Sequence, residues 1–187
     1  MRHDGQVTVT ARPATASDAP ALASVAALTF PLACPPGTSL VDIARFVTTV
    51  LSEARFDEHL ADPARHVLVL VDDEAGSDDA LLGYALLVTG EPADADVAAA
   101  VEARPTVELS KFYVVPAAHG QGAARVLMEA TLATAEATGA SSIWLGVNQL
   151  NARAQGFYAK HGFERVGTKR FTVGAETHDD FVLARAL

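Results

Sequence analysis

The central stretch of the chain, residues 107–128, limits its fold more than any other part. Residues 107–115 are rich in β-branched and aromatic side chains, which suit a buried strand. Pro116 has no amide hydrogen to give to a sheet, so we expect the strand to stop there. Small residues then predict a turn, and apolar residues recur at helical spacing from Ala123 onward. The stretch therefore predicts a strand, a glycine-rich turn and a helix in direct succession.

The turn has the composition of an anion-binding site. The first amides of a helix have no partners within it and together carry about half a positive charge, which favours an anion there. Gly120 and Gly122 have no Cβ, so a phosphate could approach the backbone closely. A turn without any ligand fits as well, because short glycine motifs are weak evidence by themselves. The candidate pyrophosphate cradle consists of His119, Gly120, Gln121, Gly122, Ala123 and Ala124.

A second motif lies within residues 146–163. It reads Asn-x-Arg-Ala-x-x-Phe-Tyr-x-x-x-Gly-Phe and comprises Asn151, Arg153, Ala154, Phe157, Tyr158, Gly162 and Phe163. In this order and separation, the two segments resemble the GNAT superfamily of acyl-CoA-dependent N-acetyltransferases. The acyl-CoA loop of that family corresponds here to His119, Gly122 and Ala124. The family usually has Gln or Arg in place of His119, which weakens the expected side-chain contact but leaves the backbone cradle intact.

The resemblance implies an α/β (α+β) fold. Its sheet would be mixed, mostly antiparallel, of six to seven strands flanked by helices, and two central strands would splay apart. Those strands are residues 107–115 and 141–147. One N-acetyltransferase domain would span residues 1–187, with residues 1–6 as a disordered N-terminus.

Residue patterns predict the other elements. Three prolines and a glycine favour a loop over residues 30–38, and the acidic residues 72–79 favour a hairpin turn over a metal site. No metal is expected. Further helices are expected after an N-cap at Ser17 and at 39–51, 52–61, 94–103 and 151–161. Further strands are expected at 7–12, 65–71, 81–88, 163–168 and 180–185.

The resemblance also assigns residues to acetyl-CoA, the implied cosubstrate. Phe112 and Val114 would contact its pantetheine arm through main-chain atoms, and Asn151 would bond the arm or order the loop. The pyrophosphate would be held by Gly120, Gln121, Gly122, Ala123, Ala124 and Arg125.

Tyr158 is the candidate general acid. A phenol has a pKa near 10, so it stays protonated at neutral pH and can protonate a departing thiolate. The alternative is that Tyr158 only packs beside Phe157. Glu108 is the leading candidate for the base, and a solvent-facing carboxylate at the strand end fits it equally well. Glu91 and His119 are weaker candidates for the base.

Charge and cysteine content narrow the possible partners and location. The net charge of −9 argues against nucleic acid and favours cationic substrates such as amines. The single cysteine, Cys34, fits a reducing compartment. No signal region follows the N-terminus, and no run approaches the roughly 18 apolar residues that span a membrane. We therefore expect a cytoplasmic protein, and the resemblance makes a homodimer possible.

The expected activity is transfer of an acetyl group from acetyl-CoA to a primary amine, directly, in a ternary complex. Residues 167–185 look like the small bacterial branch that includes polyamine and broad small-amine acetyltransferases. A peptide or protein N-terminal acetyltransferase is an alternative, although residues 143–147 lack the glutamate that this branch often carries. A catalytically silent acyl-CoA-binding module also stays open, because fold does not fix function.

Overall fold

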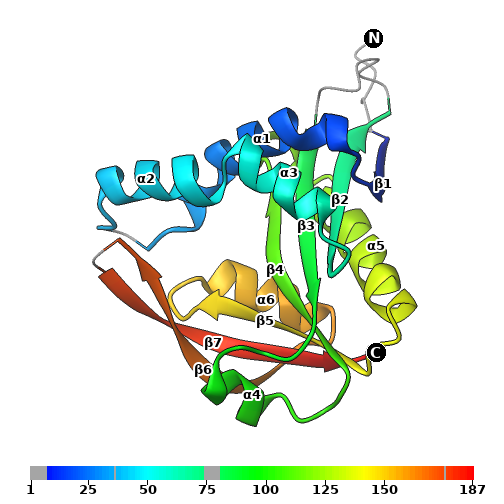
Figure 1. The fold of residues 1–187 in the computed structure, drawn as a ribbon, viewed down its shortest axis with the longest axis vertical. Helices are drawn as coiled ribbons and strands as arrows, with labels where there is room; N and C mark the ends of the chain where they lie inside the picture. The colour runs from blue at the N-terminus through cyan, green and yellow to red at the C-terminus, as the bar shows by residue number, and fades with distance from the viewer. Residues whose placement is uncertain (1–7, 36, 74–80, 175) are drawn as a thin grey trace.

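The computed structural model describes residues 8–35, 37–73, 81–174 and 176–187. Its centre is a seven-stranded sheet in the order β1-β2-β3-β4-β5-β7-β6 (Figure 1). The strands are β1 (Val9–Pro13), β2 (Arg65–Asp72), β3 (Leu81–Thr89), β4 (Thr106–Val114), β5 (Ser142–Asn148), β6 (Glu164–Val173) and β7 (Glu176–Ala186). All neighbouring pairs are antiparallel except β4 and β5, which are parallel. This mostly antiparallel sheet with flanking helices confirms the expected fold class.

Helices lie on both faces of the sheet. They are α1 (Ala19–Ala33), α2 (Leu40–Val50), α3 (Glu53–Ala61), α4 (Ala95–Ala100), α5 (Ala123–Ala137) and α6 (Ala152–Lys160), with short 3-10 turns η1 (Ala16–Asp18) and η2 (Pro116–Ala118). Because successive strand residues face opposite sides, the sheet separates two cores. Leu70 and Leu109 pack on the α5 and α6 side, whereas Val69 and Tyr84 pack on the side of α1, α2 and α3. A smaller cluster on this second side joins α4 to Trp144 and Val182.

The two central strands part from each other after a short contact. β4 and β5 pair only between residues 106–108 and 142–144. Beyond this point β4 stays paired with β3, and β5 stays paired with β7. Ser110 is an extra residue in β4, since Leu87 aligns with Leu109 and Leu86 aligns with Lys111. Such a bulge bends a strand, and here it lies where the strands separate.

The helix α1 is longer than the sequence predicts. A loop was expected from Phe30 onward, but α1 continues through Pro31 to Ala33. Phe30 is 4% exposed, and its ring stacks on Phe46 of α2 with the centroids 4.5 Å apart. The free energy gained by burying this side chain offsets the loss of the hydrogen bond that a proline removes near a helix end.

The last two strands are also longer than residues 163–168 and 180–185, because β6 and β7 continue to pair with each other up to their turn. The N-terminal residues 1–6, and most of the acidic turn at 72–79, lie outside the described residues.

One helical stretch in the described chain, residues 16–33, is long and apolar enough to cross a membrane by length and composition alone. A buried core helix passes the same test, and this stretch includes the polar residues Asp18, Ser24 and Thr29, so it is not a run of 18 apolar residues. Leu22 and Ala26 of this stretch are fully buried against the sheet, as in a core helix.

Candidate functional site

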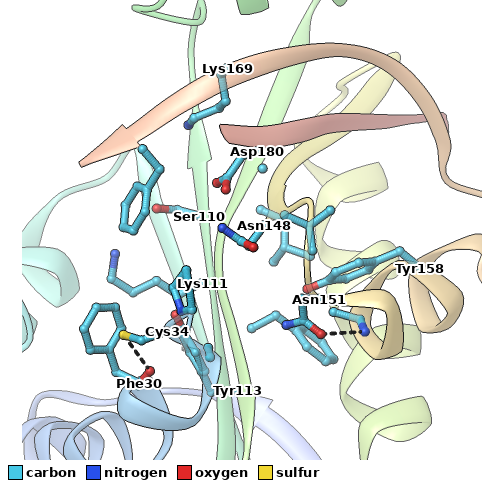
Figure 2. A pocket seen from close by; sticks show the side chains of 18 of the residues that line it. Phe30, Cys34, Ser110, Lys111, Tyr113, Asn148, Asn151, Tyr158, Lys169 and Asp180 are labelled. Atoms are coloured by element: carbon cyan, nitrogen blue, oxygen red, sulfur yellow. Dashed lines mark hydrogen bonds between the residues drawn. The ribbon is translucent and has the colours of Figure 1, made fainter. Parts of the chain in front are cut away.

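A pocket of about 280 Å³ lies where β4 and β5 part (Figure 2). The C-terminal end of α1 and the helix α2 contribute Phe30, Cys34 and Phe46 to its wall. From the opposite side of the sheet, α6 contributes Tyr158. Its remaining lining comes from the strands and loops and includes Glu108, Ser110, Lys111, Phe112, Tyr113, Gly146, Asn148, Asn151, Lys169, Phe171 and Asp180. Side chains from both faces of the sheet therefore line the pocket.

The bulge in β4 decides which side chains face which side of the pocket. Lys111 aligns with Leu86 and faces the side of α1, whereas Phe112 aligns with Ala85 and faces the side of α6. Phe112 packs there against Phe157 and Tyr158, with ring centroids 5.5 and 6.3 Å away. Without the extra residue, the alternation of the strand would place these side chains the other way round.

Tyr158 of α6 is held in place by aromatic side chains from β4 and from the segment after α6. It is 9% exposed, and its ring contacts Phe112 and Phe163 edge to face. Figure 2 shows its hydroxyl turned toward the pocket beside Asn151. Burial raises the pKa of Tyr158 above its ordinary value, so the phenol keeps its proton throughout the neutral range. No hydrogen bond of this hydroxyl is found among the described residues.

Asn151 both lines the pocket and begins α6. Its Oδ1 accepts a hydrogen bond from the backbone amide of Ala154 at 3.0 Å, which caps the helix. The cap orients the first turn of the helix, and Tyr158 lies two turns further along. The side-chain amide of Asn151 remains available for donation into the pocket.

Glu108 lies in the pocket wall opposite α6. It aligns with Trp144 across the parallel β4–β5 pair, and aligned residues share a face of the sheet. Glu108 is thus on the same side as Lys111, whose pKa is lowered by burial and raised in part by the charge of Glu108. The two weaker candidates for the base do not line the pocket: Glu91 pairs with Arg104 at 2.6 Å, and His119 bonds the backbone of Val114.

The glycine-rich turn lies outside the pocket, at the N-terminus of α5. Gly122 is the N-cap of α5, and Gly120 and Gly122 have φ of 82° and 81°, values that favour glycine. A Cβ at either position would meet no protein atom within 4 Å, so both face open space. Among the described residues, the backbone amides of residues 120–124 donate no hydrogen bond to a backbone carbonyl. The turn therefore fits a phosphate group.

The side chains of this turn contribute less than its backbone. The His119 ring nitrogen Nε2 lies 2.9 Å from the carbonyl oxygen of Val114, and Gln121 donates to the carbonyl of Ala117 at 3.1 Å. Arg125 is exposed, 3.6 Å from Glu129. Ala123 is buried and Ala124 is half-buried. Val114 pairs with Gly83 in the sheet and does not line the pocket.

The structure thus brings four of the expected site residues into one pocket: Glu108, Phe112, Asn151 and Tyr158. It adds Asp180, Lys169 and Lys111, which sequence patterns did not single out. For Asp180, a hint was the polar start of a closing strand that is otherwise apolar. Among the described residues, no group of three or more His, Cys, Asp or Glu side chains gathers as a metal site.

A model of the acetyltransferase (GNAT) family matches residues 38–163. An uncharacterized N-acetyltransferase of Mycobacterium tuberculosis is 48% identical over 171 residues, which cover 91% of this chain and 99% of that protein. The PaiA N-acetyltransferase of Thermoplasma acidophilum, solved in complex with coenzyme A, has a TM-score of 0.72 at 17% identity and covers 96% of this chain and 99% of its own. The ribosomal-protein-S18-alanine N-acetyltransferase of Escherichia coli has a TM-score of 0.64 at 19% identity, covering 96% of this chain and 94% of its own. The chain therefore belongs to the acetyltransferase (GNAT) family and is an acetyl-CoA-dependent N-acetyltransferase.

Proposed function

We propose that this enzyme transfers the acetyl group of acetyl-CoA directly to a primary amine while both substrates occupy the pocket. The observation that carries this proposal is that Tyr158 and Glu108 line one pocket from opposite faces of the sheet. A proton donor and a proton acceptor would then flank the reacting atoms. The net charge of −9 favours the approach of a cationic amine.

The two residues would balance the protons of the reaction. Glu108 would take one proton from the ammonium group, and the neutral nitrogen would then form a bond to the acetyl carbon and lose its second proton. Tyr158 would give its phenolic proton to the sulfur as the carbon–sulfur bond breaks. The products are an acetamide and a free thiol. Two protons have left the nitrogen and one has reached the sulfur, so one proton passes to solvent as both side chains return to their starting states.

Cys34 lines the pocket but fits poorly as a covalent carrier of the acetyl group. Its Sγ donates to the carbonyl of Phe30 at 3.4 Å, and burial raises the pKa of the thiol. A thiol is a much weaker nucleophile than a thiolate. Direct transfer needs no such intermediate.

The backbone of the glycine turn would hold the pyrophosphate. Substitution of Gly122 by valine should weaken the binding of coenzyme A at least about tenfold, because the side chain would fill the open space over the amides. Gly139 is a matched control, since its φ of 78° is similar and a Cβ there also meets no atom within 4 Å. Both variants should lose similar stability from the left-handed backbone. Calorimetric titration with coenzyme A would contradict the cradle if Gly122→Val and Gly139→Val bound equally well.

A thiol-release assay tests the proposed function. Acetyl-CoA would be incubated with the enzyme and either small primary amines, spermidine or short peptides with free N-termini. We expect release with the small amines, including the polyamine, at rates well above those with peptides. Preference for peptides would replace this proposal with N-terminal acetylation of peptides or proteins. If none of these acceptors led to thiol release although acetyl-CoA bound measurably, the protein would be a catalytically silent binding module.

A further inference from the structure

Three adjacent strands place a row of polar side chains across one end of the pocket. Asn148 on β5 aligns with Asp180 on β7, and Asp180 aligns with Lys169 on β6. Figure 2 shows Lys169 and Asp180 on one side of Asn148, with Asn151 and Tyr158 on the other. The row is therefore set apart from the residue proposed to protonate the sulfur.

Asp180 is the buried member of the row, and one of its carboxylate oxygens has no hydrogen-bond partner among the described residues. It is only 7% exposed, and the oxygen without a partner is Oδ1. Asn148 bonds the carboxyl group through its side chain, while its own Oδ1 accepts from the amide of Leu150 at 2.9 Å. Burial raises the pKa of Asp180, because a carboxylate in this place has lost water without gaining a full set of donors. Rotation about Cβ–Cγ exchanges the two oxygens, so a donor in the pocket can use either.

The neighbouring lysines do not supply the missing hydrogen-bond donor of this carboxylate. Lys169 lies with its Nζ 5.3 Å from the centre of the Trp144 ring, and no ion pair joins it to Asp180 in the described chain. The charge of Lys111 is balanced in part by Glu108. The charge of Lys169 lowers the pKa of Asp180 in part, but the Oδ1 of this carboxylate still has no hydrogen-bond donor among the described residues.

There is also room and an apolar wall beside Asp180. Gly146 lines the pocket, and a Cβ at this position would lie 3.4 Å from the Oδ2 of Asp180 and 3.2 Å from Cδ of Lys169. A side chain at Gly146 would therefore press on both groups, and the glycine lets them lie over β5 at the pocket. Phe30, Phe46 and Phe171 pack together in the wall of the pocket, with the centroids of the last two 6.2 Å apart. This wall suits the methylene groups of an acceptor.

We infer that Asp180 determines acceptor specificity by binding a cationic N–H group of the acceptor other than the amine that is acetylated. This inference depends on the proposed amine acetylation and adds the class of amine. The preferred acceptor has two amino groups separated by an apolar chain, with one at the thioester and the other at Asp180. A carboxylate in place of the second amine would be repelled.

Acceptors of matched length test this inference on the unmodified enzyme. The diamines 1,3-diaminopropane, 1,4-diaminobutane and 1,5-diaminopentane would each be compared with propylamine, butylamine and pentylamine, and 4-aminobutanoate would serve as the anionic probe. For at least one length, kcat/KM should be at least about tenfold higher for the diamine, beyond the factor of two for its two equivalent amines. Equal values at all three lengths, or a preference for 4-aminobutanoate, would overturn the assignment of Asp180.

A neutral variant tests the residue itself. Asp180→Asn should reduce kcat/KM for the preferred diamine about tenfold more than for the monoamine of the same length, mainly through KM. Asp179→Asn removes the same charge from an exposed neighbour and should leave the preference in place. Thermal melting and coenzyme A binding would show that the variants are folded, and the comparison on the unmodified enzyme stands even if Asp180→Asn is not. A similar loss for both kinds of amine would refute a selective role for Asp180.

The two proposals fail in different ways. If monoamines and diamines react equally well, amine acetylation stands and only the role of Asp180 falls. If no amine reacts while acetyl-CoA still binds, the proposed function falls and the inference falls with it.

Discussion

Replacing Tyr158 by phenylalanine should lower kcat about 1000-fold, within the range that a positioned general acid contributes. The variant loses one hydroxyl and keeps the ring that packs on Phe112 and Phe163. The affinity for acetyl-CoA should therefore change little, and so should the melting temperature. Steady-state kinetics with a reactive amine, together with calorimetric titration of acetyl-CoA, separate the two effects.

Tyr113 provides the matched control for this experiment. It lines the same pocket, and its ring stacks on Tyr84 with the centroids 5.6 Å apart. Tyr113→Phe removes the same atom from the opposite side of the sheet and should keep most of the activity. If Tyr158→Phe turned over as fast as Tyr113→Phe, the phenol of Tyr158 would have no part in the chemistry.

Replacing Glu108 by glutamine should reduce kcat/KM about 100-fold at neutral pH, because an ammonium group must lose a proton before its nitrogen can attack. The loss should shrink as the pH rises. Primary amines have pKa values of about 10. Below that pH, each rise of one pH unit increases the concentration of neutral amine roughly tenfold. The profile of kcat/KM against pH for Glu108→Gln should therefore rise steadily toward that of the unmodified enzyme.

Glu102→Gln is the control for the change of charge, since Glu102 is exposed and does not line the pocket. It should match the unmodified enzyme at every pH. A loss in Glu108→Gln that stays constant across the pH range would mean that Glu108 supports the structure or binds the acceptor. In that case it would not be the proton acceptor.

The sequence was most informative where a function depends on neighbouring residues. The turn at Gly120 and Gly122 and the helix that carries Tyr158 were both located from short motifs, because a helix start and a helical face are local features. The strand boundaries near the centre of the chain differ from the structure by one residue: residues 107–115 were expected and β4 spans Thr106–Val114.

The sequence was least informative where three distant segments meet. The row of Asn148, Lys169 and Asp180 exists only because β7 pairs with β5 on one side and with β6 on the other. No local pattern contains that register. The continuation of α1 through Pro31 was missed for a similar reason, since it depends on Phe30 stacking against a residue of α2.

The extra residue in β4 has a consequence for how this protein can change over time. Side chains beyond Ser110 face their present sides only because the strand carries one more residue than its partner. Loss of Ser110 would turn Lys111 toward α5 and the ring of Phe112 toward α2, and it would remove the bend that opens the sheet. A substitution in this strand alters one side chain of the pocket. A change in the length of the strand would move every side chain beyond the point of change to the opposite wall. The number of residues in β4 is therefore under as tight a constraint as the identity of any side chain that it presents.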